Sequence, residues 1–269
     1  MKKTIFIFFL SGSIFAQGPV DGFMKKKTEF SLGLSFSREK ANEMFAGPNL
    51  VSVNRTTRAA SFFGIYGITD KLNIQVGIPY LDVNKGIEKG FQDGSIYLKY
   101  NLLKKENAFG EIRTMVAAGY ADPLSNYQTE NSSSIGQMAM AGDARIIVHQ
   151  SFKSNLFATL QGGYIFKSEP TPHAIASSLK IGYAGKLYVD VYYELIHALG
   201  GTDYRGVGDL QPTSARGGFE SLGFSYQKIG GTIYYGIHKH FGAFGGVSYI
   251  LDGRNAFKNT GFSLGFVFQ

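Results

Sequence analysis

Eleven polar side chains in the middle of the chain have the types and spacing that chemistry inside a protein requires. They are Lys99, Glu111, Arg113, Asp143, Arg145, His149, Lys180, Tyr188, Asp190, Tyr192 and Glu194. The set contains four bases and four acids, so its charges balance. One interpretation is a polar lining that guides a solute; the other is a network of salt bridges that fills a closed interior. Pairing of adjacent strands predicts Lys99 near Glu111 and Arg113, and Lys180 near Asp190 and Glu194.

The sequence holds only incomplete versions of a catalytic and of a metal-binding arrangement. A barrel hydrolase would need a nucleophile, a base within hydrogen-bond reach and a third group that orients the base. His197 and Ser221 are the nearest approach to such a set, and the spacing places no third group. His238 and His240 share a strand face, but two histidines without a third ligand are a weak zinc pattern. We therefore predict no catalytic residue, no metal ligand and no cofactor, and we expect the chain not to be an enzyme.

The polar residues must be positioned by strands. Apolar and polar residues alternate in many segments, among them 28–36, 72–80, 95–102 and 187–195. A period of two with one polar face is typical of a half-buried strand. No apolar run approaches the length of about 20 residues that a membrane-spanning helix needs. The 35 Gly, 23 Phe and 16 Tyr also favour an all-β chain.

Two hairpins can be registered from the sequence. A three-residue turn at 69–71 pairs Tyr66 with Ile74 and places apolar partners on one face. A three-residue turn at 184–186 pairs residues 181 with 189 and 179 with 191. On the opposite face this second register sets Lys180 against Asp190.

Short and long links alternate along the chain. Short links are expected near 69–71, 103–107, 151–154, 184–186 and 239–242, and long polar links near 39–56, 82–93, 121–140, 168–173, 199–218 and 252–259. This pattern predicts an all-β fold, an up-and-down antiparallel transmembrane β-barrel of about 12 strands with short periplasmic turns and long extracellular loops. Segment 219–241 is taken as one long strand with an extracellular extension, which keeps the count even.

A soluble β-sandwich shows the same local alternation. The faces opposite the apolar rows decide between the two, because they carry glycines such as Gly77 and Gly182 together with bulky residues of opposite charge. The last strand, "GFSLGFVFQ", then presents Phe262, Leu264, Phe266 and Phe268 to lipid.

The N-terminus reads as an export signal. Lys2 and Lys3 precede a short apolar run, and cleavage after Ala16 would lower the net charge from +7 to +5 by removing those two lysines. We therefore divide the chain into a signal peptide at 1–16, a short periplasmic segment at 17–27 and a barrel domain at 28–269. The segment at 17–27 is too short for a plug domain. The absence of Cys fits export to an oxidising compartment, and the diffuse positive charge does not indicate a nucleic-acid partner.

Three stretches resemble a family of outer-membrane transporters named for an association with the phenol-degradation meta pathway. "YGITDKLNIQVGIPYL" (66–81) resembles its strand-turn-strand, "GFQDGSIYLKYNLL" (90–103) a strand start, and "LDGRNAFKNTGFSLGFVF" (251–268) its last hairpin, through Gly253, Arg254 and Asn255. Gln92 stands where the family pattern has its second Gly. The resemblance implies a barrel in the outer membrane of a Gram-negative bacterium and supplies no catalytic residue.

These observations predict a passive channel for small solutes, hydrophobic or aromatic ones among them. The expected partners are outer-membrane lipid, a small-molecule solute and the barrel-assembly machinery. A lipid-modifying barrel enzyme and a structural or adhesive barrel with functional loops remain as alternatives.

Overall fold

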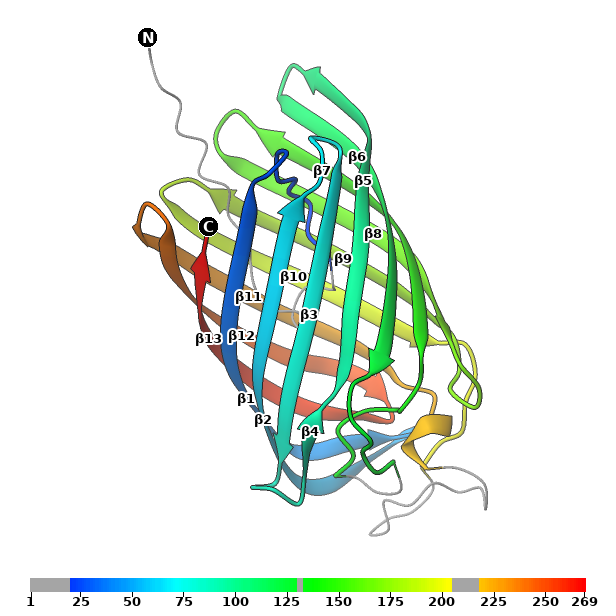
Figure 1. Cartoon of the computed structure of the whole chain (residues 1–269). Coiled ribbons are helices and arrows are strands. Elements are labelled where there is room, and N and C mark those ends of the chain that lie inside the picture. The colour runs from blue at the N-terminus through cyan, green and yellow to red at the C-terminus, as the bar shows by residue number, and fades with distance from the viewer. Residues whose placement is uncertain (1–19, 130–132, 205–217) are drawn as a thin grey trace.

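A closed antiparallel β-barrel makes up the chain in the computed structural model, which describes residues 20–129, 133–204 and 218–269 (Figure 1). The described residues form thirteen strands, and among them β4 (Glu88–Phe91) is a short addition that pairs only with β3. The other twelve are β1 (Phe30–Ala46), β2 (Asn49–Gly67), β3 (Leu72–Val83), β5 (Asp93–Asn107), β6 (Gly110–Pro123), β7 (Ala141–Phe152), β8 (Leu156–Lys167), β9 (Ala174–Ala184), β10 (Leu187–Ala198), β11 (Ser225–His238), β12 (Phe241–Arg254) and β13 (Ala256–Phe268). The predicted count of twelve barrel strands is confirmed.

The barrel closes where the first strand meets the last. β1 pairs with β13 on one side and with β2 on the other, and β2 continues to β3. In the described ranges, closure pairs both edges of each of the twelve barrel strands, which is the condition for crossing a hydrocarbon layer with strands.

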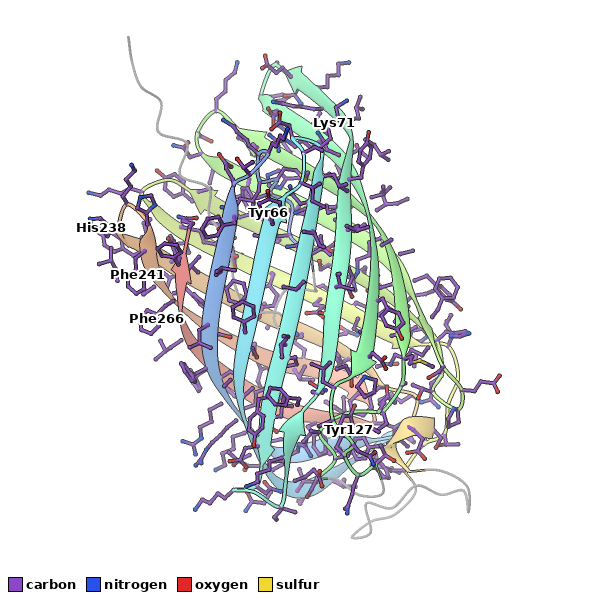
Figure 2. All side chains as sticks on the ribbon, in the orientation of Figure 1. Tyr66, Lys71, Tyr127, His238, Phe241 and Phe266 are labelled. Carbon is purple, nitrogen blue, oxygen red and sulfur yellow. The ribbon has the colours of Figure 1, made fainter. Side chains whose placement is uncertain are left out.

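The outer surface is apolar and the inner surface polar, the reverse of a soluble protein. In β13 the outward residues Phe262 and Leu264 are 61% and 70% exposed, while Val267 faces inward and is buried. Phe241 and Phe266 point away from the barrel in Figure 2, and their rings stack at 5.6 Å. The row of side chains that ends the sequence therefore lies on the apolar outer face, as predicted.

The two ends of the barrel differ. Short turns, the start of β1 and the C-terminus share one end, where Figure 2 labels Lys71 and His238; Tyr127 lies at the other end with the longer loops. In barrels of this type the short turns face the periplasm. We name the two ends periplasmic and extracellular accordingly.

Two of the predicted long links are wrong. β1 and β2 run on to a tight turn at Gly47 and Pro48, so 39–56 is mostly strand, and only Asn255 separates β12 from β13. Gly47 and Asn255 both adopt positive φ, at 58° and 53°, which lets the chain reverse within so few residues. Polar residues misled the prediction because these strands extend beyond the roughly 9–11 residues that a membrane requires.

Segment 219–241 holds one barrel strand, as predicted. Its first part is not a strand extension, because a short 3-10 helix at Phe219–Ser221 precedes β11.

One of the two predicted strand registers is confirmed, and the other is shifted. Tyr66 pairs with Ile74 in β2 and β3, as predicted. In β9 and β10 the register is shifted by two, so Ile181 pairs with Val191 and Lys180 with Tyr192. A shift of two keeps every side chain on its predicted face.

Within the described ranges, no helix is both long and apolar enough to cross a membrane. The predicted signal peptide at 1–16 lies outside the described residues.

Candidate functional site: the barrel lumen

All eleven polar residues selected from the sequence lie on the inner face. Nine are buried, each residue no more than 7% exposed: Lys99, Asp143, Arg145, His149, Lys180, Tyr188, Asp190, Tyr192 and Glu194. Glu111 and Arg113 lie near the periplasmic end, are partly exposed and form a salt bridge with each other.

Three buried ion pairs lie on the inner face, one within β7 and two between neighbouring strands. The guanidinium of Arg145 donates to both carboxylate oxygens of Asp143 at 2.8–3.0 Å. Lys180 lies 3.7 Å from Asp190. The partner of Glu194 is Lys228 at 2.8 Å, and not Lys180 as predicted. Every one of these charges has an opposite charge beside it, which burial in a low-dielectric interior requires.

Sequence reasoning missed Lys228, although the alternation of β11 would have placed it inward with Thr232 and Tyr234. Tyr226, on the same face, donates its hydroxyl hydrogen to Glu194 at 2.9 Å. The alternation of β11 is regular, and it is the signal that could have found Lys228.

The predicted grouping of Lys99 with Glu111 and Arg113 is wrong. The register places Lys99 opposite Ala117, further along β6. Its ammonium group instead contacts Asp21, 2.7 Å away, which belongs to the segment before β1. Lys99 is completely buried by this contact.

The segment at 20–25, here called the inner segment, runs inside the barrel (Figure 1, dark blue). Its backbone is held by polar side chains of the wall. Gln161 donates to the carbonyl of Val20 at 3.1 Å, and the amide of Asn73 bonds both the N–H and the C=O of Lys25, at 2.8 and 2.9 Å. Part of the predicted periplasmic segment 17–27 therefore lies in the lumen, held by side chains and by no strand pairing.

Aromatic rings contact the same segment from the side. The ring of Phe23 lies edge-on to His149 at 4.6 Å and to Phe157 at 5.1 Å. Gly22 passes so close to the wall that a Cβ there would lie 2.3 Å from Nδ1 of His149. Only glycine fits at this point without displacing the histidine.

Large rings of the lumen are folded against the wall. A Cβ added at Gly230 would lie 2.2 Å from the hydroxyl oxygen of Tyr192, so this ring covers the glycine of the neighbouring strand. The same arrangement recurs in the pairs Gly33–Phe63, Gly119–Tyr97, Gly182–Phe157, Gly242–Tyr234 and Gly265–Phe244. Inward glycines thus make room for inward rings, and these rings do not have to cross the lumen.

A cavity of about 430 Å³ occupies the extracellular part of the lumen. Aromatic rings of Phe219, Phe224 and Phe257 line it together with charged groups. The guanidinium of Arg55 lies 4.4 Å from the ring centre of Phe257 and donates to the carbonyl of Ser134 at 2.9 Å. The cavity is therefore amphipathic.

The extracellular loops are fixed over this cavity by residues of the last hairpin. Asn255 is fully buried; its amide nitrogen donates to the carbonyls of Thr202 and Gly223, and its oxygen accepts from Gly47 and Tyr204. Arg254 forms a salt bridge of 2.6 Å with Asp203. The Arg-Asn pair noted in the sequence therefore holds loops in place.

A second cavity of about 900 Å³ lies at the periplasmic end. It is lined by Phe23 and Met24 of the inner segment and by Glu111, Arg113 and His149 of the wall. The two cavities share no lining residue.

The residues considered for catalysis do not come together. His197 pairs across the sheet with Ile175 on the outer face. Ser221 belongs to the 3-10 helix, and its hydroxyl bonds the carbonyl of Gly218 and the hydroxyl of Thr202. His240 bonds the C-terminal carbonyl of Gln269 at 2.8 Å. Among the residues described, no group of three potential metal ligands occurs.

Comparison with known proteins supports the fold. Neither a family model nor a curated protein matches the sequence. The crystal structure of an outer membrane channel from Pseudomonas putida F1 superimposes with a TM-score of 0.69 at 14% identity, covering 93% of this chain and 99% of that one. The NanC porin matches with a TM-score of 0.55 at 9% identity, covering 88% of this chain and 99% of that chain. The KdgM porin matches with a TM-score of 0.51 at 9% identity, covering 88% and 98%. At these identities the likeness shows the barrel fold.

Proposed function

We propose that this protein is a passive channel of the outer membrane for small solutes. The observation that carries the proposal is the division of the lumen. Two cavities of about 430 and 900 Å³ lie one behind the other, and Val20 and Asp21 of the inner segment lie in the layer between them. Side chains fill the interior of barrels with about eight strands, whereas this barrel of twelve strands retains open space that a solute can occupy.

Solute passage requires the inner segment to move. Side-chain contacts hold it without any strand pairing, so its release leaves the barrel hydrogen bonds intact. Such release is a small local opening of the kind that proteins undergo well below their global unfolding free energy. We infer that the segment leaves the lumen intermittently, which gives a low and fluctuating conductance.

The solutes proposed are small, with an apolar or aromatic part. Phe219, Phe224 and Phe257 offer ring faces in the extracellular cavity, and Arg55 and Lys167 offer donors to a polar substituent. Pockets with this mixture of apolar walls and few polar groups suit such molecules. The resemblance to transporters associated with phenol degradation agrees with this class of solute, and the similarity in fold to an outer membrane channel agrees with the proposed location.

A conductance measurement tests the proposal. The full chain, refolded and inserted in planar bilayers, should show brief openings. Asn73→Ala removes both hydrogen bonds to the backbone of Lys25 and should raise the open fraction. Asn101→Ala is the matched control, because Asn101 is also an inward asparagine near the periplasmic end and none of the bonds that hold the segment involves it. A correctly folded barrel that conducts in none of these forms would contradict the channel.

A further inference from the structure

Two arginines face each other on the outer surface of the barrel. Arg38 of β1 is directly opposite Arg58 of β2, and both side chains are exposed. Lys40, the next outward residue of β1, is exposed beside them. Like charges directly opposite one another on neighbouring strands are destabilising. A partner of opposite charge would remove this repulsion.

The described residues do not supply that partner. Asp82 is opposite Arg58 on β3, but it forms no salt bridge, and its carboxylate accepts the N–H of Gly86 at 2.6 Å. Glu39 lies on the inner side, where it binds Asn259. Within the described part of the chain, no salt bridge or side-chain hydrogen bond involves Arg38, Arg58 or Lys40.

The position of the cluster along the strand identifies its surroundings. Proceeding along β1 from the periplasmic end, the outward residues are Phe30, Leu32, Leu34 and Phe36, all exposed and apolar, and the next is Arg38. Phe262 of β13, which pairs with Arg38, is 61% exposed. The arginines therefore stand where the apolar surface ends, on the extracellular side. This is the depth of lipid headgroups in the outer leaflet.

We propose that Arg38 and Arg58, assisted by Lys40, bind the phosphate groups of a phosphorylated glycolipid in the outer leaflet. Guanidinium groups bind phosphate oxygens through two parallel hydrogen bonds, and a phosphate between two arginines neutralises both. Phe36, the outward residue before Arg38, and Phe262, opposite Arg38 on β13, are exposed for contact with acyl chains, which favours a lipid over a free anion. The inference rests on the proposed outer-membrane location and is independent of solute transport.

Binding to bisphosphorylated lipid A tests the inference. The full chain, folded in detergent micelles, is titrated with bisphosphorylated lipid A and with the same lipid lacking phosphates. Arg38→Gln combined with Arg58→Gln should weaken binding of the phosphorylated lipid at least about tenfold. Lys71→Gln combined with Lys105→Gln removes the same charge from exposed positions at the periplasmic end and should leave binding unchanged. Equal loss in both double variants would overturn the proposal, and so would equal binding of the lipid without phosphates.

A stability measurement is a second test, because the inference predicts the direction of the stability change in each lipid. In vesicles of neutral phosphatidylcholine the Arg38→Gln, Arg58→Gln variant should unfold at the same or a higher denaturant concentration than the parent, because repulsion is relieved. In vesicles that contain lipid A the parent should be the more stable of the two. The same order in both lipids would overturn the proposal, as would displacement of lipid A by an equal concentration of inorganic phosphate. A barrel that binds lipid A but does not conduct would contradict the proposed channel function and would leave the lipid-binding inference intact.

Discussion

Val76 and Gln75 are neighbours in β3, yet their side chains meet different surroundings. Val76 is 37% exposed on the apolar outer surface, whereas Gln75 is 9% exposed in the lumen. The alternation of strand side chains causes this difference. The sequence predicted it reliably, because one polar and one apolar face persist along each strand. At the scale of the residue, the side of the strand therefore determines what a substitution does.

An arginine at position 76 should destabilise the barrel. Val76 lies midway along the outward apolar row of β3, so Val76→Arg should lower the free energy of unfolding by about 2–4 kcal/mol. Ser37→Arg is the control, because Ser37 lines an inner cavity next to Glu39 and the new charge has room and a partner there. Urea titration of the barrel in lipid vesicles measures both. Equal destabilisation by the two substitutions would contradict the assignment of the faces.

The ring-over-glycine pairs predict a second effect at this scale. A Cβ at Gly33 would lie 1.9 Å from the ring of Phe63, so Gly33→Ala should destabilise by about 1–3 kcal/mol through displacement of that ring. Phe63→Leu should restore much of the loss in the double variant. Gly162→Ala meets no atom within 4 Å and serves as the control, with no loss expected. Chemical denaturation in vesicles gives the four values of this cycle, and purely additive effects would argue against the pairing.

At the scale of elements, strand identity and number were predictable and some details were not. The turn at 69–71 fixed the register of β2 and β3, and Thr69 supports it by accepting the N–H of Leu72 at 3.0 Å. The turn after β9 lies one residue later than predicted, because both alternatives bring apolar residues together on the same face. The alternation of residues determines which face of the sheet each side chain occupies. It does not distinguish between two strand registers that differ by two residues.

The position of the inner segment could not be predicted from the sequence, for a different reason. Residues 20–25 show no alternation, and their binding depends on Asn73, Lys99 and Gln161 from three separate strands. Only the closed barrel brings these residues together. The salt bridge of Lys99 was misassigned for the same reason, since its partner comes from outside the sheet.

The position of Lys25 predicts that opening of the channel depends on pH. Burial in the docked segment lowers the pKa of Lys25 from 10.5 to about 8, against the opposing effect of the Glu29 and Asp21 carboxylates. The docked form thus binds fewer protons than the released form between these two values. Docking is consequently strengthened as the pH rises from about 8 to 10.5 and is weakest below 8. The open fraction in single-channel recordings should be larger at pH 7 than at pH 9.5.

Two lysine variants check the origin of this dependence. Lys25→Met removes the titrating group and should abolish most of the difference between pH 7 and 9.5. Lys27→Met changes an exposed neighbour and should preserve it. An unchanged pH profile in Lys25→Met, or more frequent opening at the higher pH in the parent, would contradict the docking equilibrium.

At the scale of the whole molecule, the barrel is closed towards each end in a different way. Loops anchored by Arg254 and Asn255 cover the extracellular cavity. The inner segment lies beside the periplasmic cavity. Rings folded over glycines leave space between these closures. Twelve strands enclose more room than the eight that side chains alone can fill. The sequence predicted the strand number, but the distribution of open space depends on side-chain packing that no pattern displays.

This distribution of space predicts which solutes pass. Liposomes that contain the parent barrel should take up small aromatic solutes slowly and disaccharides hardly at all, because Tyr188 and Phe157 stack at 5.5 Å beside the inner segment. Tyr188→Ala should raise both rates, since it removes a ring that also lies 6.4 Å from Phe23. Tyr192→Ala should change them little, because that ring already lies against Gly230. Equal effects of the two substitutions would contradict this role for Tyr188, and a folded barrel that admits neither solute in any form would favour a structural role.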